Sequence, residues 1–359
     1  MSALWHAGHG PYLALYLATL ALHAVFVSYL VGGTAFVLAA HLARAVRGAR
    51  GARGDDAPAS PLAAQIASWL PLSMGAAITA GVAPLLFLQI LYQRAFYTAN
   101  LLLGPIWGAM IPALVLGFYL LYLHKARPAL RPKLVLGLAL ACFTLVAALW
   151  GANHRVMVTP SGWTDAYRGS PLSAYGWSLV FRAPVWLGAM LAQFAAIAAW
   201  QARGASRGSR ELRALAGTAL AGRALSAAGA LALGWHAQLA TPLAGALLAA
   251  IALEASLWVT LASAPSGARR AVATRVYLGL LSGAAALALA AALAVRELPR
   301  LAHLRELPAS VQRAGGAWLF ATFAALALAI LAAILRAARR ALPAEPAAAA
   351  GASDVSPPA

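Results

Sequence analysis

The sequence predicts an all-α polytopic membrane protein with about nine transmembrane helices, and three observations support this fold class. Of its 359 residues, 62% are hydrophobic and only 10% are charged, and the mean hydropathy is +0.77. Apolar stretches of about 20 residues, the length that crosses a bilayer core as a helix, recur along the whole chain. Their interiors are rich in Ala, Leu and Gly and lack strand-like alternation, which favours helices over a β-barrel.

Nine of these stretches are expected to form one transmembrane helical domain over residues 1–341. Their many small residues let helix backbones approach closely. Residues 342–359 are rich in Ala, Pro and Ser and have too little apolar variety to pack, so we expect a disordered tail. The expected spans are residues 12–40, 67–91, 101–123, 134–152, 176–200, 215–235, 242–262, 276–295 and 318–335.

The net charge of +18 is explained by membrane topology better than by nucleic acid, because Lys and Arg are distributed over the connections between spans. The connections fall alternately on two sides. One side receives 18 Lys and Arg residues and the other receives 8, while Arg223 lies inside the sixth span. The positive-inside rule then predicts an amino terminus outside and a carboxyl terminus in the cytoplasm.

The sequence shows neither a cleavable signal peptide nor a set of paired cysteines. The first apolar run lacks a basic region before it and is longer than a signal peptide, so we expect it to stay as a helix. The single cysteine, Cys142, excludes an internal disulfide framework. No Cys-x-x-Cys-His motif is present, so the sequence predicts no covalent haem c, and any haem would need side-chain ligands.

His23 is the most informative residue, because it stands alone inside the first apolar run. An ionisable side chain at membrane depth is costly, and it is either paired within the bundle or part of a site. One interpretation is a neutral imidazole hydrogen-bonded to a neighbouring helix. The other is a metal ligand, with a haem iron as the metal. The sequence leaves both open.

The other histidines divide between the two sides of the predicted topology. His41 and His124 fall at cytoplasmic helix ends, where a partly solvated histidine is expected. Five histidines fall on the outer side, where they could converge on a metal or a docked redox partner, and the alternative is ordinary polar surface. His154 and His236 lie at the outer ends of the fourth and sixth spans, and the others are His6, His9 and His303.

Glu254 is the only one of nine acidic residues that falls inside an expected span. There it would be protonated or paired, with Arg223 as the candidate partner. Glu254, Gln89 and Arg182 are candidates for a proton or quinone site, and the alternative is a set of hydrogen bonds that pin helices together. The connection over residues 154–175 contains Pro, Gly and aromatic residues and is expected to form a structured cap over the outer end of the bundle.

Three segments in the first 200 residues resemble subunit I of the cytochrome bd quinol oxidases. Residues 22–32, Leu-His-Ala-Val-Phe-Val-Ser-Tyr-Leu-Val-Gly, are similar to the family's first helix, where the histidine that matches His23 is a haem ligand. Residues 148–153, followed by Met157 and Pro160, look like the end of the family's fourth helix. Residues 183–185, Ala-Pro-Val, are similar to the Asn-Pro-Val that begins its fifth helix. Nine spans with an outer amino terminus also agree with the family.

The departures from that family concern its chemistry. The fifth-helix histidine that binds the low-spin haem is replaced by Ala192, with Gln193 next to it. The third-helix glutamate has no counterpart in residues 108–112. The acid expected after residues 79–84 is missing, with Gln89 the nearest polar residue, and the quinol-binding loop is reduced to residues 237–241. Because these groups hold irons and deliver protons, we expect no oxygen reduction by this chain alone.

The resemblance implies a diverged bd-like subunit of a respiratory electron-transfer complex in a bacterial-type cytoplasmic (inner) membrane. Haem b on His23 is the expected cofactor, with His154 or His236 as the candidate second ligand, and no enzyme activity is assigned. The expected partners are membrane lipid, other membrane subunits or a periplasmic cytochrome, and quinone, with no nucleic acid. The alternative is a cofactor-free transporter or scaffold subunit, in which His23, Glu254, Arg182 and Arg223 line a polar path or tie helices together.

Overall fold

The computed structural model describes residues 10–49, 60–169, 171–204, 208–234, 241–265 and 268–298, together with a few positions between 322 and 336. Contacts divide the chain into two units, Met1–Leu307 and Pro308–Ala359. The helices α2 to α11 all belong to the first unit. The ninth expected span and the expected tail lie almost wholly outside the described residues.

Within the described residues, eight helices are long and apolar enough to cross a membrane, so the chain is a helical multi-pass membrane protein. They follow the first eight expected spans in order. Most extend beyond the predicted limits, because helical backbone continues past the apolar core into more polar turns. The candidate spans are Tyr12–Gly48, Pro61–Leu103, Ile106–Ala126, Pro132–Met157, Arg182–Arg203, Arg210–Ala232, Pro242–Ser263 and Arg275–Glu297.

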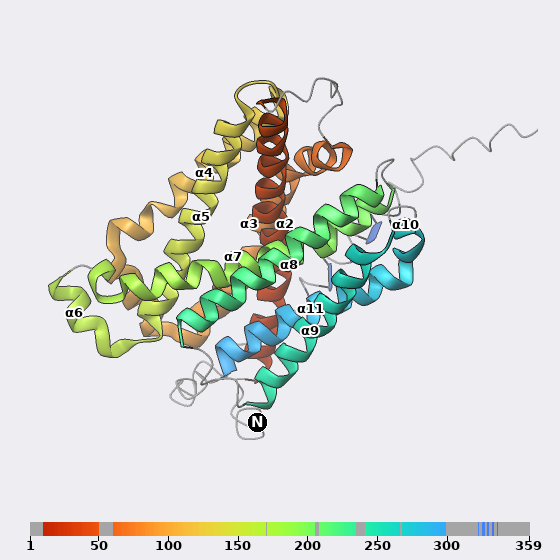
Figure 1. Ribbon diagram of the computed structural model, residues 1–359. Coiled ribbons are helices and arrows are strands. Elements are labelled where there is room, and N and C mark those ends of the chain that lie inside the picture. The colour runs from red at the N-terminus through yellow and green to blue at the C-terminus, as the bar shows by residue number, and fades with distance from the viewer. Residues whose placement is uncertain are drawn as a thin grey trace, which may run out of the picture. The chain divides into compact units, whose positions relative to one another are not determined.

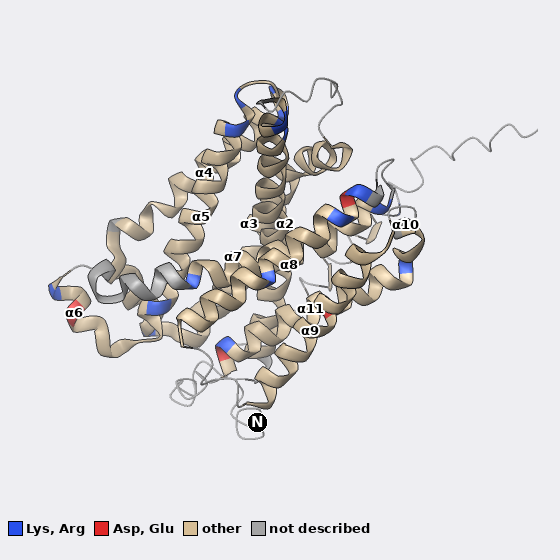
Figure 2. Cartoon of the chain, in the orientation of Figure 1, with Lys and Arg blue, Asp and Glu red and all other residues tan. Residues whose placement is uncertain are grey.

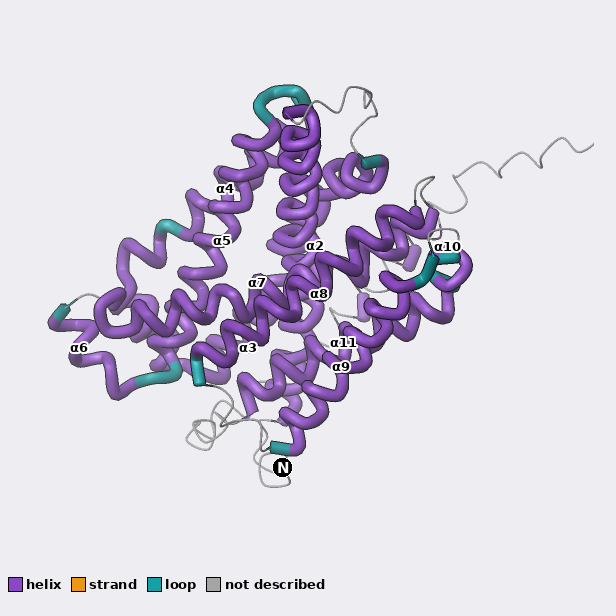
Figure 3. The backbone as a smooth tube through the Cα atoms, in the orientation of Figure 1, coloured by secondary structure: helices purple, strands orange, loops and turns teal. Residues whose placement is uncertain are grey.

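The helices form pairs that pack around α2 (Figures 1 and 3). α2 lies against α3, α5 and α7, while α4 packs on α5 as a hairpin. α7 pairs closely with α8, and α9 pairs with α11 beside them. The bounds are α2 (Gly10–Ala49), α3 (Pro61–Gly108), α4 (Met110–Ala126), α5 (Pro132–Met157), η1 (Pro160–Gly162), α6 (Trp163–Arg168), α7 (Pro171–Gly204), α8 (Gly208–Ala232), α9 (Pro242–Ser263), α10 (Arg269–Val272) and α11 (Arg275–Glu297).

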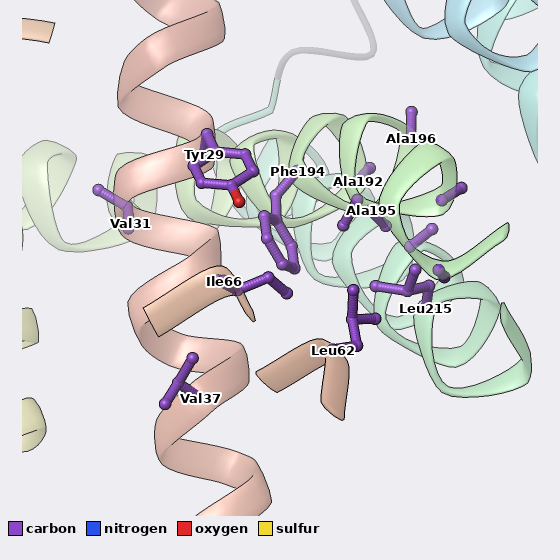
Figure 4. Close-up of a cluster of buried hydrophobic side chains, with 14 of the residues drawn as sticks. Tyr29, Val31, Val37, Leu62, Ile66, Ala192, Phe194, Ala195, Ala196 and Leu215 are labelled. Carbon is purple, nitrogen blue, oxygen red and sulfur yellow. The ribbon is translucent and has the colours of Figure 1, made fainter. Parts of the chain in front are cut away.

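Phe194 of α7 organises the core where α2, α3 and α7 meet (Figure 4). A Cβ at Gly32 of α2 would lie 2.4 Å from the Cβ of Phe194, so only glycine allows this approach. The Phe194 ring meets that of Tyr29 edge-on, with 5.8 Å between the ring centroids. Ile66 of α3 is fully buried in the same cluster. These contacts fix α2 between its neighbours.

Small residues set the close packing of α7 on α8. A Cβ at Gly188 would lie 2.2 Å from the carbonyl oxygen of Gly222, so the two backbones touch at this point. One turn further along α8, Ser226 donates a hydrogen bond of 2.9 Å to the carbonyl oxygen of Val185. Close backbone approach and a polar interhelix bond are the means by which membrane helices associate without a hydrophobic driving force between them.

The expected spans leave residues 92–100 as a link between the second and third spans, but the structure joins these spans by helix. α3 continues through this region as helix, with left-handed backbone at Gln93 (φ 34°) and Gly104 (φ 48°). The two breaks turn the chain while keeping most backbone hydrogen bonds within helix, which lowers the cost of a polar backbone near a membrane. The segment between them carries buried Phe96 and Leu103 and exposed Tyr97.

The described residues of the connection over residues 154–175 are mostly helical. α5 continues to Met157, and the short helices η1 and α6 follow before α7 begins at Pro171. The indole N–H of Trp163 donates a 2.8 Å hydrogen bond to the carbonyl oxygen of Val156. α6 contacts α3 and α7. The connection therefore packs onto the helices that it follows and precedes.

Basic residues gather at particular helix ends (Figure 2). One group lies at the end of α2 and in the link from α4 to α5, and another lies where α7 ends and α8 begins. Both groups belong to the connections that the charge count assigns to the cytoplasmic side.

Candidate functional site

His23 is fixed by a hydrogen bond between α2 and α3. Its Nδ1 lies 2.9 Å from the carbonyl oxygen of Ala77. A carbonyl oxygen only accepts, so Nδ1 carries the proton, and in the neutral ring Nε2 keeps its lone pair. A histidine that binds a metal uses this arrangement, with one ring nitrogen held by a carbonyl and the other left for the ion. The same bond also ties the two helices together.

Gly81 leaves the space that the His23 ring occupies. A Cβ at Gly81 would lie 2.9 Å from Cε1 and 3.0 Å from Nδ1 of His23. No side chain at this position is compatible with the observed ring, because real Cβ atoms do not approach so closely. Residue 81 lies one helical turn after Ala77, so a single face of α3 supplies both the hydrogen-bond acceptor and the space for the ring.

A second polar site joins α3, α5 and α11, and we call its members Tyr92, His154, Arg296 and Glu297 the Glu297 cluster. The Tyr92 hydroxyl donates a 2.8 Å hydrogen bond to Oε2 of Glu297. Nε2 of His154 lies 3.2 Å from Oε1 of the same carboxylate. Arg296 Nε donates to Oε1 from the neighbouring position, at 2.5 Å. Three helices thus converge on one carboxylate.

The carboxylate of Glu297 is almost fully shielded from solvent, with a side chain that is 1% exposed. Removing a charge from water costs several kcal/mol unless partners compensate it. Here a guanidinium neutralises the charge, and a phenol and an imidazole saturate the oxygen atoms. The Arg296 side chain is 36% exposed, so it is less shielded than the carboxylate that it neutralises. The arrangement keeps a charged or proton-sharing group stable at one end of the bundle.

Neighbouring contacts hold His154 in position. Asn153, the preceding residue, donates a short hydrogen bond from its side-chain amide to Asn100 of α3. One turn before it on α5, Trp150 stacks on Trp107, with 5.3 Å between the ring centroids. These two contacts hold the end of α5 against α3, so the position of the His154 imidazole beside Glu297 is fixed by packed helices.

Glu254 and Arg223 form the third polar site, between α8 and α9. Arg223 Nε donates a 3.0 Å hydrogen bond to Oε2 of Glu254, and its Nη2 contacts the same oxygen. Glu254 is fully buried and the Arg223 side chain is 11% exposed. The indole N–H of Trp258, one turn along α9, lies 3.4 Å from Oε1. The sequence predicts Arg223 as the candidate partner of Glu254, and the structure contains this ion pair.

The expectation that Glu254 is the only acid within a span is wrong. Glu297 is the last residue of α11, and Glu211 lies in the first turn of α8, where it accepts the backbone N–H of Leu62 at 2.9 Å. Both are buried. The helices extend beyond the apolar stretches, so residues assigned to links lie within helical ends. One signal could have identified Glu297. Adjacent Arg and Glu residues follow the end of an apolar stretch, and a histidine, His154, is expected on the same side of the membrane.

Among the described residues, no reported contact joins the other predicted site residues to one another. His236 lies outside the described residues, as do His6, His9 and His303. Gln89 is half-buried on α3, one turn before Tyr92, and Arg182 is half-buried on α7. In the part of the chain that the structure describes, no three His, Cys, Asp or Glu side chains could hold a metal ion. Within the same residues, no described contact joins His23 to His154.

Comparison with protein-family models, with curated proteins and with solved structures finds no match to this chain. The class is therefore defined by the fold alone: the described residues form a helical multi-pass membrane protein.

Proposed function

We propose that the chain is a diverged cytochrome bd-like integral membrane subunit of a respiratory electron-transfer complex, with haem b held on His23. The bond from His23 Nδ1 to the Ala77 carbonyl carries this proposal, because it leaves Nε2 as the ligand atom. A haem bound there would supply a one-electron carrier. The role of the chain's own residues is to fix the ring, with Ala77 setting the tautomer and Gly81 making room.

The second ligand of such a haem stays open between His154 and His236. Nε2 of His154 is bonded to Glu297, so His154 would have to leave that carboxylate or bind through its other nitrogen. His236 lies outside the described residues. The proposal therefore requires only His23.

Oxygen reduction is not part of the proposal. Ala192, which replaces the family's fifth-helix ligand, is fully buried. A Cβ at Gly222 of α8 would lie 3.2 Å from the Ala192 backbone nitrogen, so the two helices are in close contact at this level. This tight packing is consistent with the absence of a low-spin haem ligand at position 192. Electrons of the proposed complex would enter or leave through partner subunits or a periplasmic cytochrome. Quinone and membrane lipid are the other proposed partners, and the proposed location is a bacterial-type inner membrane with the amino terminus outside.

The test is haem content. The full chain is expressed in a haem-replete bacterial host, purified in mild detergent and compared with His23→Ala and His41→Ala, which remove the two histidines of α2. We expect haem b in the wild type and in His41→Ala, and its loss in His23→Ala, by pyridine haemochrome and reduced-minus-oxidised spectra. Size-exclusion profiles check that all three proteins are folded. Equal haem in all three, or none in the wild type, would refute the ligand assignment.

The second candidate is a cofactor-free scaffold or transporter subunit. The Arg223–Glu254 pair and the His23–Ala77 bond both join neighbouring helices, which is what this function requires. The same experiment separates the two, because a scaffold contains no haem and His23→Ala would then lower only the thermal stability.

A further inference from the structure

His41 of α2 and His124 of α4 are the strongest unassigned feature, and we call them the histidine pair. Their rings meet edge-on, with 5.8 Å between the ring centroids and 87° between the ring planes. The two residues are far apart in the sequence, so helix packing brings them together. α2 and α4 both pack on α5, which holds the two helices next to each other.

His124 is buried, contrary to the expectation of a partly solvated histidine near this helix end. It is 4% exposed and lies on the face of α4 that also carries buried Gly117 and Leu121. At Gly117 this face packs on the Phe143 ring of α5, where an added Cβ would lie 2.5 Å from the nearest ring carbon. His124 therefore belongs to the packed side of α4. His41 is half-buried, so its side of the pair remains in contact with solvent.

The Nδ1 atom of His124 is shielded from solvent, and it has no hydrogen-bond partner within the described residues. A buried ring nitrogen without a partner is costly, and native structures satisfy almost all such atoms. The neighbouring ring is a second imidazole, but no hydrogen bond from it reaches Nδ1. A shared proton therefore does not satisfy this nitrogen, whereas a metal ion would.

The spacing of the two rings fits a shared ion. A metal ion lies about 2.0–2.1 Å from an imidazole nitrogen, and so about 3.2 Å from the centre of the ring. Two rings on one ion then have centroids about 5.2 Å apart at the tetrahedral angle and about 6.4 Å apart when they lie opposite each other. The observed 5.8 Å lies between these limits. An ion fits the pair without a large movement of either helix.

The surroundings of the pair select the class of ion. Arg44 and Lys133 act electrostatically on His41 and oppose a further positive charge. Both side chains are exposed, so water and salt screen them. Mg²⁺ and Ca²⁺ need several oxygen ligands, and the histidine pair supplies none. Zn²⁺, Ni²⁺ and Cu²⁺ form bonds to neutral imidazole nitrogen, and these bonds offset the nearby charge.

We propose that the histidine pair binds a divalent transition-metal ion, with one nitrogen from each ring as a ligand. Nδ1 of His124 is one ligand atom, because it is the buried ring nitrogen without a partner. Water completes the coordination from the side of half-buried His41. The ion would link α2 directly to α4. This inference is independent of haem on His23.

The test uses the full chain without an affinity tag, stripped of metal with a chelator and titrated with Cu²⁺, the ion of highest affinity for nitrogen sites. Electron paramagnetic resonance counts the nitrogens on the bound ion, and we expect two. His41→Phe and His124→Phe should each weaken the site by at least about 100-fold, since even the outer partners of a metal ligand are worth 10- to 100-fold. The double variant should lose no more than either single variant, because both rings hold one ion.

The matched control is His6→Ala/His9→Ala, which removes two other histidines that are close in the sequence. It should keep the two-nitrogen site, and Cu²⁺ should raise the unfolding temperature of this control and of the wild type but not of His41→Phe. Size-exclusion profiles check folding, and half-buried position 41 decides the test if His124→Phe does not fold. Losses that add in the double variant would mean two separate sites, and equal binding in all variants would mean adventitious copper only. Either result would overturn the proposal.

Discussion

The Arg223–Glu254 pair and the Glu297 cluster each place a carboxylate beside an arginine, but they differ in depth and in the number of partners. Glu254 lies near the middle of α9 and has one cation and one long bond from Trp258. Glu297 lies at the end of α11 and receives donors from three side chains. Arg296 is 36% exposed, whereas Arg223 is 11% exposed. The carboxylate at the helix end thus has more partners than the one near the helix middle, and its arginine is more exposed.

The largest effect is expected from Glu254→Ala. It leaves the Arg223 guanidinium unpaired at membrane depth, and breaking a buried pair from one side costs about 3–5 kcal/mol. The measurement is the free energy of unfolding in detergent. Glu254→Ala/Arg223→Leu, which removes both charges, should recover much of the loss. A double variant as unstable as the single one would show that the pair is not the source of the effect.

A smaller loss, about 1–3 kcal/mol, is expected from Glu297→Ala, because Arg296 can turn to solvent while Tyr92 and His154 lose their acceptor. The same unfolding experiment provides the value. Asp165→Ala, which removes an exposed carboxylate of α6, is the matched control and should change little. If Glu297→Ala costs as much as Glu254→Ala, exposure of the arginine is not what separates the two sites.

Tyr92→Phe sharpens the comparison further by removing one of the three donors to Glu297. The ring packing remains, and the expected loss is about 1 kcal/mol, the net value of one hydrogen bond. Hydrogen exchange should rise at the carboxyl end of α11, since the bond joins that end to α3. Unchanged exchange there would mean that His154 and Arg296 hold Glu297 without Tyr92.

The smallest effect is expected from Trp258→Phe. The bond from its indole to Glu254 is 3.4 Å long and joins residues of the same helix, so its loss should cost under about 1 kcal/mol. The side chain is fully buried, and some of this cost reflects the smaller ring. Thermal denaturation of Trp258→Phe beside Tyr92→Phe ranks the two donors. A larger loss of stability in Trp258→Phe than in Tyr92→Phe would show that packing contributes more than hydrogen bonding at this site.

The sequence anticipated the helical class and the order of the first eight spans, because hydrophobicity over about 20 residues is a property of the chain itself. It also identified Glu254 and Arg223 as a candidate pair, since two opposite charges in neighbouring spans have few other partners. It missed Glu297, because a residue two positions past an apolar stretch cannot be distinguished from a loop residue without knowing where the helix ends. The breaks at Gln93 and Gly104 were also not predicted, because they lie where the expected spans gave no information on the helix ends.

Composition and charge alone determined that this protein is a multi-pass membrane protein with helical spans, since the cost of unsatisfied backbone groups in lipid permits little else. Which side chains meet was decided by tertiary structure. The carbonyl under His23, the glycine that makes room for its ring, and the three helices around Glu297 are separated by 54 to 205 positions in the chain. Local sequence cannot specify such contacts, because helix packing, and not hydrophobicity, selects the faces that touch.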